Sequence, residues 1–272
     1  MPELPEVETT RLGIQPHIEG QGINEMIIRQ PRLRWPVPTE LTNILPQQTI
    51  EKVVRRGKYL LFQTKAGTLI THLGMSGSLR ILTDSIAPGK HDHIDIIFAN
   101  HICLRFNDPR RFGCFLWTTE NPYQHDLLKN LGPEPLTNLF DGDYLFEQSR
   151  KRTTPIKHFI MDSQIVVGVG NIYANEALFY SGIHPEEKAG KINAARYYLL
   201  AENIKSILAQ AIKIGGTTIR NFSGSDGKPG YFKQQLKVYG RMGLPCIICK
   251  NILLEIRLGQ RSSVFCPHCQ NR

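Results

Sequence analysis

The sequence predicts an α+β protein of more than one domain, in which strands come first, helices follow and a cysteine-rich module lies last. Three observations predict this order. Apolar runs divided by turns fill the first half, apolar residues take helical spacing in the second half, and four of the six cysteines lie between residues 246 and 272. A chain of 272 residues can form two ordinary domains and bury a sizeable core.

The first half is expected to begin with one helix and to continue with hairpins. Leu4, Val7, Ile14 and Ile18 share a helical face, and Gly20 marks the end of that helix. Apolar runs then flank short turns in two places, where 59–62 is followed by 69–70 and 94–98 by 102–106. Several hairpins in succession predict a β-sandwich or a barrel.

The second half is expected to be helical. The predicted helices are 143–151, 155–162, 171–180 and 194–214. Pro155 suits a first helical turn, and the glycines at 215 and 216 suit a helix end. Between the two halves, residues 131–135 contain two prolines that interrupt both patterns. We therefore expect the boundary between the strand domain and the helical domain near residue 132.

The cysteine module predicts a metal site. Its cysteines form two pairs, each with two residues between its members and with sixteen residues between the pairs: Cys246, Cys249, Cys266 and Cys269. This spacing lets two tight turns supply four thiolates to one tetrahedral Zn²⁺, and a site without an open position is structural. Disulfides are the alternative, which a reducing cytoplasm disfavours. Segments 252–258 and 264–265 are the expected strands between the pairs, with Arg261 at the hairpin tip.

The charge is basic and unevenly distributed. The net charge is +9, and 229–272 holds seven Lys or Arg residues against one acid, Glu255, while 150–157 holds four bases and no acid. Such blocks fit a polyanionic partner or, alternatively, a solvated basic surface. No apolar run is long enough for a membrane span and no secretory signal is present, so we expect a cytoplasmic protein. Cys103 and Cys114 lie in apolar surroundings and are expected to be buried thiols.

The N-terminus offers unusual chemistry. Removal of Met1 would expose the secondary amine of Pro2, and α-amino groups have a pKa of about 8. A partly neutral amine of this kind can attack C1′ of a sugar and form a Schiff base, and the adjacent Glu3 could move protons. The alternative is an acidic first helical turn that the helix dipole favours. Further along, the glycines of 168–171 could approach a phosphate or form a packing turn, with Asn171 as helix cap.

An ordered set of motifs resembles the formamidopyrimidine-DNA glycosylase family from end to end, and their joint occurrence is highly specific. The motifs are Pro2-Glu-Leu-Pro-Glu-Val-Glu-Thr9, Arg56-Gly-Lys-Tyr59, His72-Leu-Gly-Met-Ser-Gly77, Lys90-His-Asp-His93, Asp108-Pro-Arg-Arg-Phe-Gly113, Val167-Gly-Val-Gly-Asn-Ile-Tyr173, Ser225-Asp-Gly-Lys-Pro-Gly-Tyr231, Val238-Tyr-Gly-Arg241 and the four cysteines.

The resemblance implies roles for individual residues. Pro2 would be the Schiff-base nucleophile, Glu3 the general acid/base, Lys58 a proton donor in β-elimination, and Arg261 a phosphate ligand that assists the second elimination. Residues that would contact DNA or fill the gap left by a flipped base are Met75, His91, Arg110, Phe112, Arg152 and Asn171. Glu6 and Glu176 resemble supporting acids near the terminal amine. Core packing is the alternative for Met75 and Phe112. Where the family often has a basic residue before Ile156-Lys157, this chain has Thr153 and Thr154, with Arg152 just upstream.

The resemblance also implies a domain plan and a reaction. It comprises a catalytic β-sandwich with a helix (1–132), a helix–two-turn–helix domain (133–222), a lesion-recognition loop (223–236) and a β-hairpin zinc finger (237–272). The expected activity is excision of oxidised purines from duplex DNA, followed by β,δ-elimination at the abasic site. The partner would be double-stranded DNA containing oxidised purines or abasic sites, with no membrane. The chain is expected to act as a monomer in the bacterial cytoplasm, associated with the nucleoid through DNA.

Two alternatives remain from the sequence. An endonuclease VIII-like glycosylase would prefer oxidised pyrimidines, but its start typically reads Pro-Glu-Gly-Pro-Glu, whereas this chain has Leu4. A non-catalytic zinc-finger damage-binding protein would make Pro2, Glu3 and Lys58 incidental. Borohydride trapping separates an enzyme from a binder, because only an imine intermediate is reduced to a covalent adduct.

Overall fold

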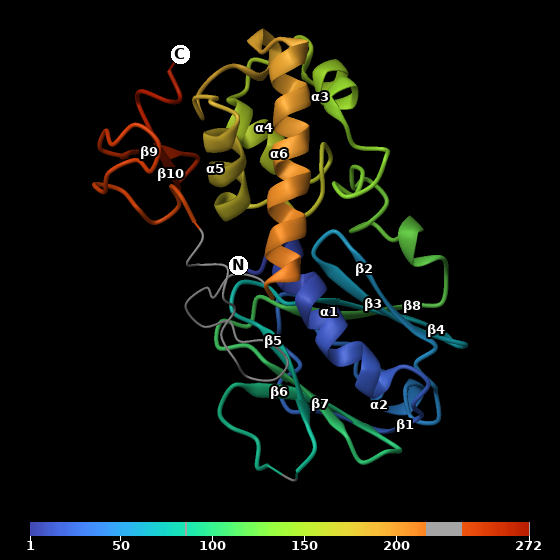
Figure 1. The fold of residues 1–272 in the computed structure, drawn as a ribbon. Helices are drawn as coiled ribbons and strands as arrows, with labels where there is room; N and C mark the ends of the chain where they lie inside the picture. The colour runs from blue at the N-terminus through green and yellow to red at the C-terminus, as the bar shows by residue number, and fades with distance from the viewer. Residues whose placement is uncertain (85, 216–235, 272) are drawn as a thin grey trace. The chain divides into compact units, whose positions relative to one another are not determined.

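The computed structural model describes residues 1–84, 86–215 and 236–271. The chain divides into two compact units, the first formed by Met1–Asn130 with Ile214–Lys233 and the second by Leu131–Lys213 with Gln234–Arg272 (Figure 1). The lesion-recognition loop expected at 223–236 lies outside the described residues, apart from Leu236.

Two four-stranded antiparallel sheets form the first unit. One sheet has the order β1-β6-β7-β5 and the other β2-β3-β4-β8. The strands of the first sheet are β1 (Ile23–Ile28), β6 (Asp92–Phe98), β7 (Cys103–Asn107) and β5 (Ser78–Leu82). Those of the second are β2 (Lys52–Arg56), β3 (Tyr59–Thr64), β4 (Gly67–His72) and β8 (Cys114–Thr118). Both hairpins expected from the sequence are therefore present, as β3–β4 and β6–β7.

Side chains from both sheets and from the first helix share one core, which identifies a sandwich rather than a barrel. Phe62 and Leu69 of one sheet lie in the same buried cluster as Phe98 and Phe106 of the other. Helix α1 (Leu4–Ile18) adds Ile14 to this core and crosses the strands, as Figure 1 shows. The first unit also contains α2 (Leu41–Ile44) and the short turn η1 (Pro122–Gln124).

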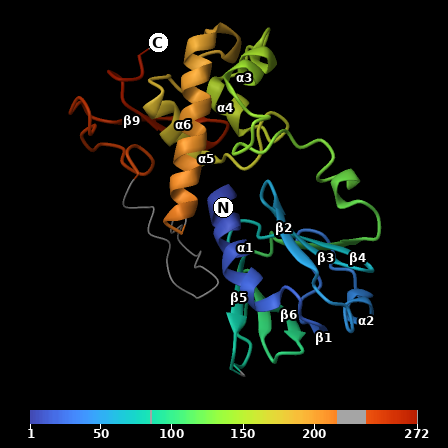
Figure 2. The ribbon, with the colours of Figure 1, turned by 45° about the vertical axis from the view of Figure 1, so that its right-hand side comes forward.

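Helices dominate the second unit. They are α3 (Gly142–Ser149), α4 (Ile156–Met161), α5 (Asn171–Tyr180), η2 (Ala189–Lys191) and α6 (Ala194–Lys213). The long α6 packs against α3 and α5, and its buried face includes Tyr197, Ile204 and Leu208 (Figure 2). The predicted helices agree with these bounds to within a residue or two. Among the described residues, none of the helices has the length and apolar character that a membrane span requires.

A two-stranded hairpin completes the second unit. Strands β9 (Leu254–Leu258) and β10 (Arg261–Phe265) pair antiparallel, and β10 packs on α5. The Val264 backbone N–H donates to Oδ1 of Asn175 on α5 at 2.8 Å, which fixes the hairpin to the helix. The second strand is longer than the predicted 264–265. The order of sandwich, helices and cysteine hairpin confirms the predicted fold class.

Candidate active site and nucleic-acid interface

The first turn of α1 buries two carboxylates beside the start of the chain. Pro2, Glu3 and Glu6 are all buried. Glu3 is the N-cap of α1, and its backbone N–H donates to Oε2 of Glu6 at 2.8 Å. Burying a carboxylate costs free energy unless the group has partners, so two buried acids beside the chain terminus indicate a specific role there.

The environment of the terminal amine favours its neutral form. Burial lowers the pKa of the Met1 amine from its ordinary value of 8.0, the carboxylates of Glu3 and Glu6 oppose this shift, and the cations of Lys58 and Arg110 add to it. An amine at this end of the chain is therefore neutral, and so nucleophilic, more often near pH 7 than an exposed amine. These charges also place Lys58 and Arg110 within electrostatic reach of the terminus.

Lys58 lies on the turn between β2 and β3 and is half-buried. Gly57 precedes it with φ 58°, a left-handed conformation that glycine adopts readily. Arg55 ties this turn to the first helix, because its guanidinium donates to Oε2 of Glu8 at 2.8 Å and to the Gly57 carbonyl at 2.9 Å. The helix that carries Glu3 and the turn that carries Lys58 are thus held together.

Two loops of the first unit present large side chains to solvent. Met75, between β4 and β5, is 39% exposed, and Phe112, between β7 and β8, is 43% exposed. The Arg110 guanidinium lies 4.9 Å from the centroid of the Phe112 ring. The core-packing alternative for Met75 and Phe112 is therefore wrong, and exposure of large apolar side chains fits a role in contact with a ligand.

The two loops abut closely. Gly74 has φ 69°, and a Cβ at this position would lie only 2.4 Å from the Gly113 nitrogen. The Gly74 N–H donates to Nδ1 of His72 at 2.9 Å. Burial, with the Lys58 and Arg34 cations, lowers the pKa of His72 to about 4, so the ring is neutral at pH 7 and Nδ1 can accept. His91, another predicted DNA contact, is half-buried just before β6.

In the second unit, Asn171 is the first residue of α5, and Gly170 is the N-cap, so the interpretation of Asn171 as the cap is wrong. Asn171 Oδ1 is buried and has no hydrogen-bond partner among the described residues. Such a polar group is available to an external ligand.

Glu176, further along α5, accepts hydrogen bonds from the backbone N–H groups of Lys237, Val238 and Tyr239 at 2.8–3.0 Å. Burial raises its pKa even though these three donors act in the opposite direction. The contact fixes the segment that leads into the cysteine module. Support of the terminal amine by Glu176 stays a prediction.

The basic block 150–157 divides into two kinds of residue. Arg150 stacks on Phe146 at 3.8 Å and donates to the Ile192 carbonyl, and Lys157 is buried. Lys151 and Arg152 are exposed. Arg150 and Lys157 are therefore used inside the unit, whereas Arg152 is available to a phosphate.

The cysteine module is suited to zinc. The Sγ atoms of Cys246, Cys249, Cys266 and Cys269 all lie within 4.8 Å of one another. Two of the Sγ–Sγ distances are 3.4 Å, for Cys249 and Cys266, and 3.9 Å, for Cys246 and Cys269. A tetrahedron with Zn–S bonds of about 2.3 Å has edges of about 3.8 Å, so the sulfur positions fit one Zn²⁺.

Sequence reasoning missed a second contact that holds the hairpin, besides the four cysteines. Arg261 is exposed and begins β10, opposite Leu258 across the turn. Next to it, Lys157 Nζ donates to the Ser262 carbonyl at 2.7 Å and to Ser263 Oγ at 2.6 Å. An apolar neighbour of Lys157, Ile156, made the helix predictable, but only the folded chain brings a lysine to serines more than a hundred residues away.

The remaining cysteines are thiols in the first unit. Burial raises the pKa of Cys114 to about 12, and Cys114 is buried as expected. Cys103, the first residue of β7, is half-buried rather than buried, and burial with the Asp95 carboxylate raises its pKa to about 11. Neither thiol is activated, since the thiolate is the reactive form.

Comparisons with known families agree with this arrangement. Residues 1–115 match the formamidopyrimidine-DNA glycosylase N-terminal domain. Residues 131–223 match the formamidopyrimidine-DNA glycosylase H2TH domain, and residues 243–272 match the zinc finger found in FPG and IleRS.

Similar proteins cover the whole chain. Formamidopyrimidine-DNA glycosylases of Marinobacter nauticus and Nitrosococcus oceani are each 58% identical, covering 99% and 100% of this chain and 100% of their own length. A solved structure of Lactococcus lactis Fpg with abasic-site DNA has a TM-score of 0.91 at 37% identity, covering 99% of this chain and 100% of that one. A MutM complex with DNA containing carbocyclic 8-oxo-G has a TM-score of 0.90 at 36% identity. Both of these matches cover 99% or more of this chain and of the solved chain.

A β-sandwich, a helical domain and a cysteine-ligated hairpin together define a class of zinc-finger DNA glycosylases. The chain belongs to the formamidopyrimidine-DNA glycosylase family. The resemblance inferred from the motifs is therefore confirmed.

Proposed function

We propose that this protein is a bifunctional DNA glycosylase and AP lyase that excises oxidised purines from duplex DNA and then nicks the strand. The observation that carries the proposal is the burial of Pro2 with the carboxylates of Glu3 and Glu6 at the start of the chain. Burial there lowers the pKa of the Met1 amine, and the cations of Lys58 and Arg110 act in the same direction. Solved relatives in complex with DNA containing an abasic site, N7-benzyl-Fapy-dG or carbocyclic 8-oxo-G support the substrate class.

In the first step, the nitrogen of Pro2, freed by removal of Met1, attacks C1′ of the damaged nucleotide. The C1′–N bond breaks, and the base leaves with the proton that the amine loses. Glu3 then protonates the sugar ring oxygen, so that the C1′–O bond opens and an iminium ion joins Pro2 to C1′. A buried carboxylate at this position is suited to the task, since general acid–base help contributes about a hundred- to ten-thousandfold.

In the second step, a proton leaves C2′ and the bond from C3′ to its phosphate oxygen breaks. Lys58 would assist the departing 3′ phosphate, and the link of its turn to α1 through Arg55 supports this role. Loss of a C4′ proton and of the 5′ phosphate completes the δ-elimination, with Arg261 holding phosphate. Water then hydrolyses the iminium ion and restores the amine.

A base flipped out of the duplex leaves a gap, and a protein usually fills it with side chains. Met75, Arg110 and Phe112 support this role because all three are exposed and two of them stack. His91, Arg152 and Asn171 are proposed to contact the DNA backbone. The exposed Arg152 and the unpartnered Asn171 Oδ1 support this assignment within the described part of the chain.

Zinc would supply structural cross-linking of the hairpin when bound to Cys246, Cys249, Cys266 and Cys269. It leaves no open coordination position for substrate. The curated relatives are bacterial, and we propose that the protein acts as a monomer in the bacterial cytoplasm, where DNA binding associates it with the nucleoid.

Borohydride trapping on duplexes that contain a single lesion tests the proposal. An 8-oxoguanine duplex and an abasic duplex should each give a covalent adduct, and an oxidised-pyrimidine duplex should react more slowly. Faster reaction with the oxidised pyrimidine would instead support an endonuclease VIII-like enzyme. Binding to damaged DNA with no adduct on any duplex would support a non-catalytic damage-binding protein.

A further inference from the structure

The exposed trio of Met75, Arg110 and Phe112 has little packing of its own to keep it in place. Met75 and Phe112 turn away from the core of the sandwich, so the backbone of their loops must determine their position. Asp108 is the first residue of the loop between β7 and β8, and its side chain is 0% exposed. A fully buried carboxylate needs donors, and those of Asp108 come from both loops.

The Asp108 carboxylate bridges the loops. Its Oδ1 accepts from the Ser76 hydroxyl at 2.8 Å and from the Arg110 backbone N–H at 3.2 Å, and its Oδ2 accepts from the Gly113 N–H at 2.8 Å. Ser76 follows Met75 directly, whereas Arg110 and Gly113 enclose Phe112. One carboxylate therefore fixes the backbone on both sides of the exposed trio.

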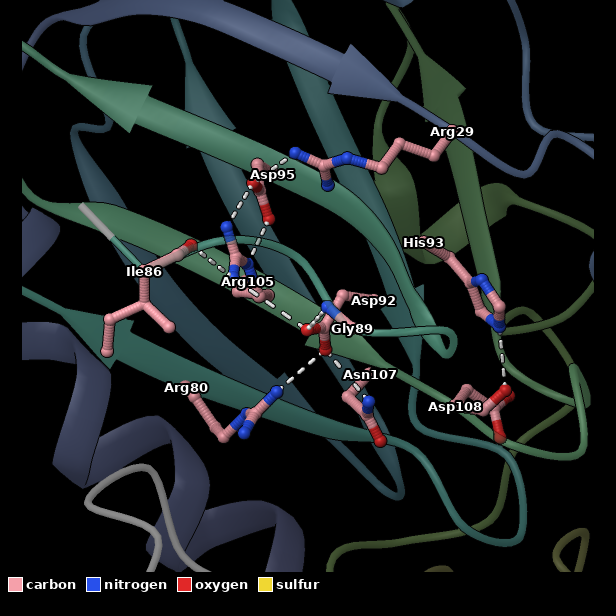
Figure 3. Close-up of polar contacts among 10 residues, drawn as sticks. All are labelled: Arg29, Arg80, Ile86, Gly89, Asp92, His93, Asp95, Arg105, Asn107 and Asp108. Carbon is pink, nitrogen blue, oxygen red and sulfur yellow. Dashed lines mark hydrogen bonds and ion pairs between the residues drawn. The ribbon is translucent and has the colours of Figure 1, made fainter.

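The backbone of Asp108 connects a third segment. Its N–H donates to the His91 carbonyl at 3.0 Å, and its carbonyl oxygen lies 2.8 Å from Nε2 of His93 (Figure 3). His91 is a proposed contact to the DNA backbone. Asp108 therefore connects the loops that carry Met75, Arg110 and Phe112 with His91, which is proposed to contact the DNA backbone.

The backbones of the two loops pack closely against each other. A Cβ on Gly113 would lie 2.5 Å from the Phe106 ring and 2.9 Å from the His72 carbonyl, and the Gly74 site is equally tight. Because the backbones of the two loops are in close contact, a change at Asp108 is expected to reach Met75 and Phe112 alike.

We propose that Asp108 is a positioning residue that holds Met75, Arg110 and Phe112 as one unit and so governs filling of the gap left by the extruded base. The proposal rests on the proposed glycosylase function. Asp108 does not touch the reacting atoms. Its effect is confined to duplex substrates, because an abasic site in a single strand has neither a base to extrude nor a stack to fill.

Asp108→Asn tests the proposal, because it keeps the size of the side chain but replaces one acceptor oxygen by a donor that faces N–H or O–H groups. We expect excision of 8-oxoguanine from duplex to fall about ten- to hundredfold, the range for loss of buried charge-assisted hydrogen bonds. Elimination at an abasic site in single-stranded DNA should stay within about twofold of the unmodified protein. Ser76→Ala, which removes one donor, should shift the same ratio in the same direction by less, and serves if Asp108→Asn does not fold.

Asp95→Asn is the matched control. Asp95 is a buried carboxylate of the same unit. It binds Arg105 at 2.8 Å and Arg29 at 2.6 Å on the β1-β6-β7-β5 sheet and does not bind the two loops (Figure 3). This variant should lower thermal stability and leave the ratio of duplex excision to single-strand elimination unchanged. An equal change of that ratio in Asp95→Asn and Asp108→Asn would overturn the proposal.

A double variant separates positioning from a general structural role. If Asp108 acts through Met75, then Asp108→Asn combined with Met75→Ala should lose no more duplex excision than the worse single variant. Losses that multiply, or equal losses on duplex and single-stranded substrates, would contradict the proposal. Failure of the proposed function itself would appear in the unmodified protein, as absence of excision, and is therefore distinguishable.

Discussion

The loop pair of the first unit and the hairpin of the second unit both present an exposed arginine beside a turn, yet they are held by different chemistry. Arg110 stands on loops fixed by hydrogen bonds to one buried carboxylate, Asp108. Arg261 stands on a two-stranded hairpin whose ends converge on four cysteines, with Lys157 as a further anchor. The loops rest on the large core of the sandwich, whereas a two-stranded hairpin is marginal by itself and needs cross-linking.

The two regions also differ in charge. The first unit has buried acids beside the terminal amine, whereas the hairpin carries exposed cations. We expect base excision to depend most on the buried acids, and loss of the hairpin to lower DNA affinity. Each of the following predictions separates these two contributions.

The largest effect is expected for Glu3→Gln. The amide keeps the shape of the side chain but cannot deliver a proton, so excision of 8-oxoguanine should fall about a hundred- to ten-thousandfold. Duplex affinity and zinc content should stay unchanged. Glu25→Gln, at an exposed position on β1, is the control and should leave the excision rate as it was. If Glu3→Gln lost DNA affinity by the same factor as excision rate, the acids of the first unit would not act on the chemistry alone.

Cys249→Ser should affect the hairpin first. With one thiolate lost, we expect the metal to leave and the hairpin to unfold, because structural zinc sites supply folding free energy directly. Duplex affinity should fall at least about tenfold, the equivalent of one charge-assisted contact. Hydrogen exchange should increase in 246–270 and stay unchanged in the strands of the first unit. Full DNA binding by a protein verified to be free of zinc would show that the metal is dispensable.

Lys157→Met tests the second anchor of the hairpin. The substitution leaves the Ser262 carbonyl and the Ser263 hydroxyl without their charged donor, so the free energy of unfolding should fall by about 1–3 kcal/mol. Zinc content should not change, and hydrogen exchange should increase mainly at 254–265. Lys151→Met, on an exposed lysine nearby, should change stability by no more than about 0.5 kcal/mol. Equal destabilisation by both variants would assign no special role to Lys157.

The smallest effects concern salt dependence. Duplex affinity should fall steeply with salt because phosphate contacts release counterions. Arg261→Ala and Arg152→Ala should each reduce the slope of log K against log salt by about one. Arg150→Gln should leave the slope unchanged and reduce stability instead, because that guanidinium is used inside the unit. An equal change of the salt slope in the Arg150 and Arg152 variants would show that both side chains contact phosphate.

Local patterns made much of this molecule predictable. The spacing of four cysteines fixes a metal site whatever surrounds it, and the alternation of apolar runs and turns fixes the hairpins β3–β4 and β6–β7. The N-terminal amine and Glu3 were visible because they are adjacent in sequence.

What could not be predicted depends on contacts across long stretches of chain. Lys157 and Arg152 lie in one basic run, yet one is buried against Ser263 and the other is exposed, a difference that only tertiary packing sets. Met75 and Phe112 are apolar like core residues, yet both are exposed on the loops where Gly74 closely approaches Gly113. Asp108 joins three segments that the sequence separates.

The proposed reaction depends on the N-terminal nitrogen of Pro2 as its nucleophile. The most direct measurement is peptide mapping by mass spectrometry of the borohydride-trapped complex with abasic DNA, made with protein whose Met1 has been removed. We predict that the reduced sugar fragment is attached to the peptide that begins with Pro2, and that protein retaining Met1 gives no adduct at this nitrogen. An adduct at Lys58 or at another lysine of the unmodified enzyme would contradict the account.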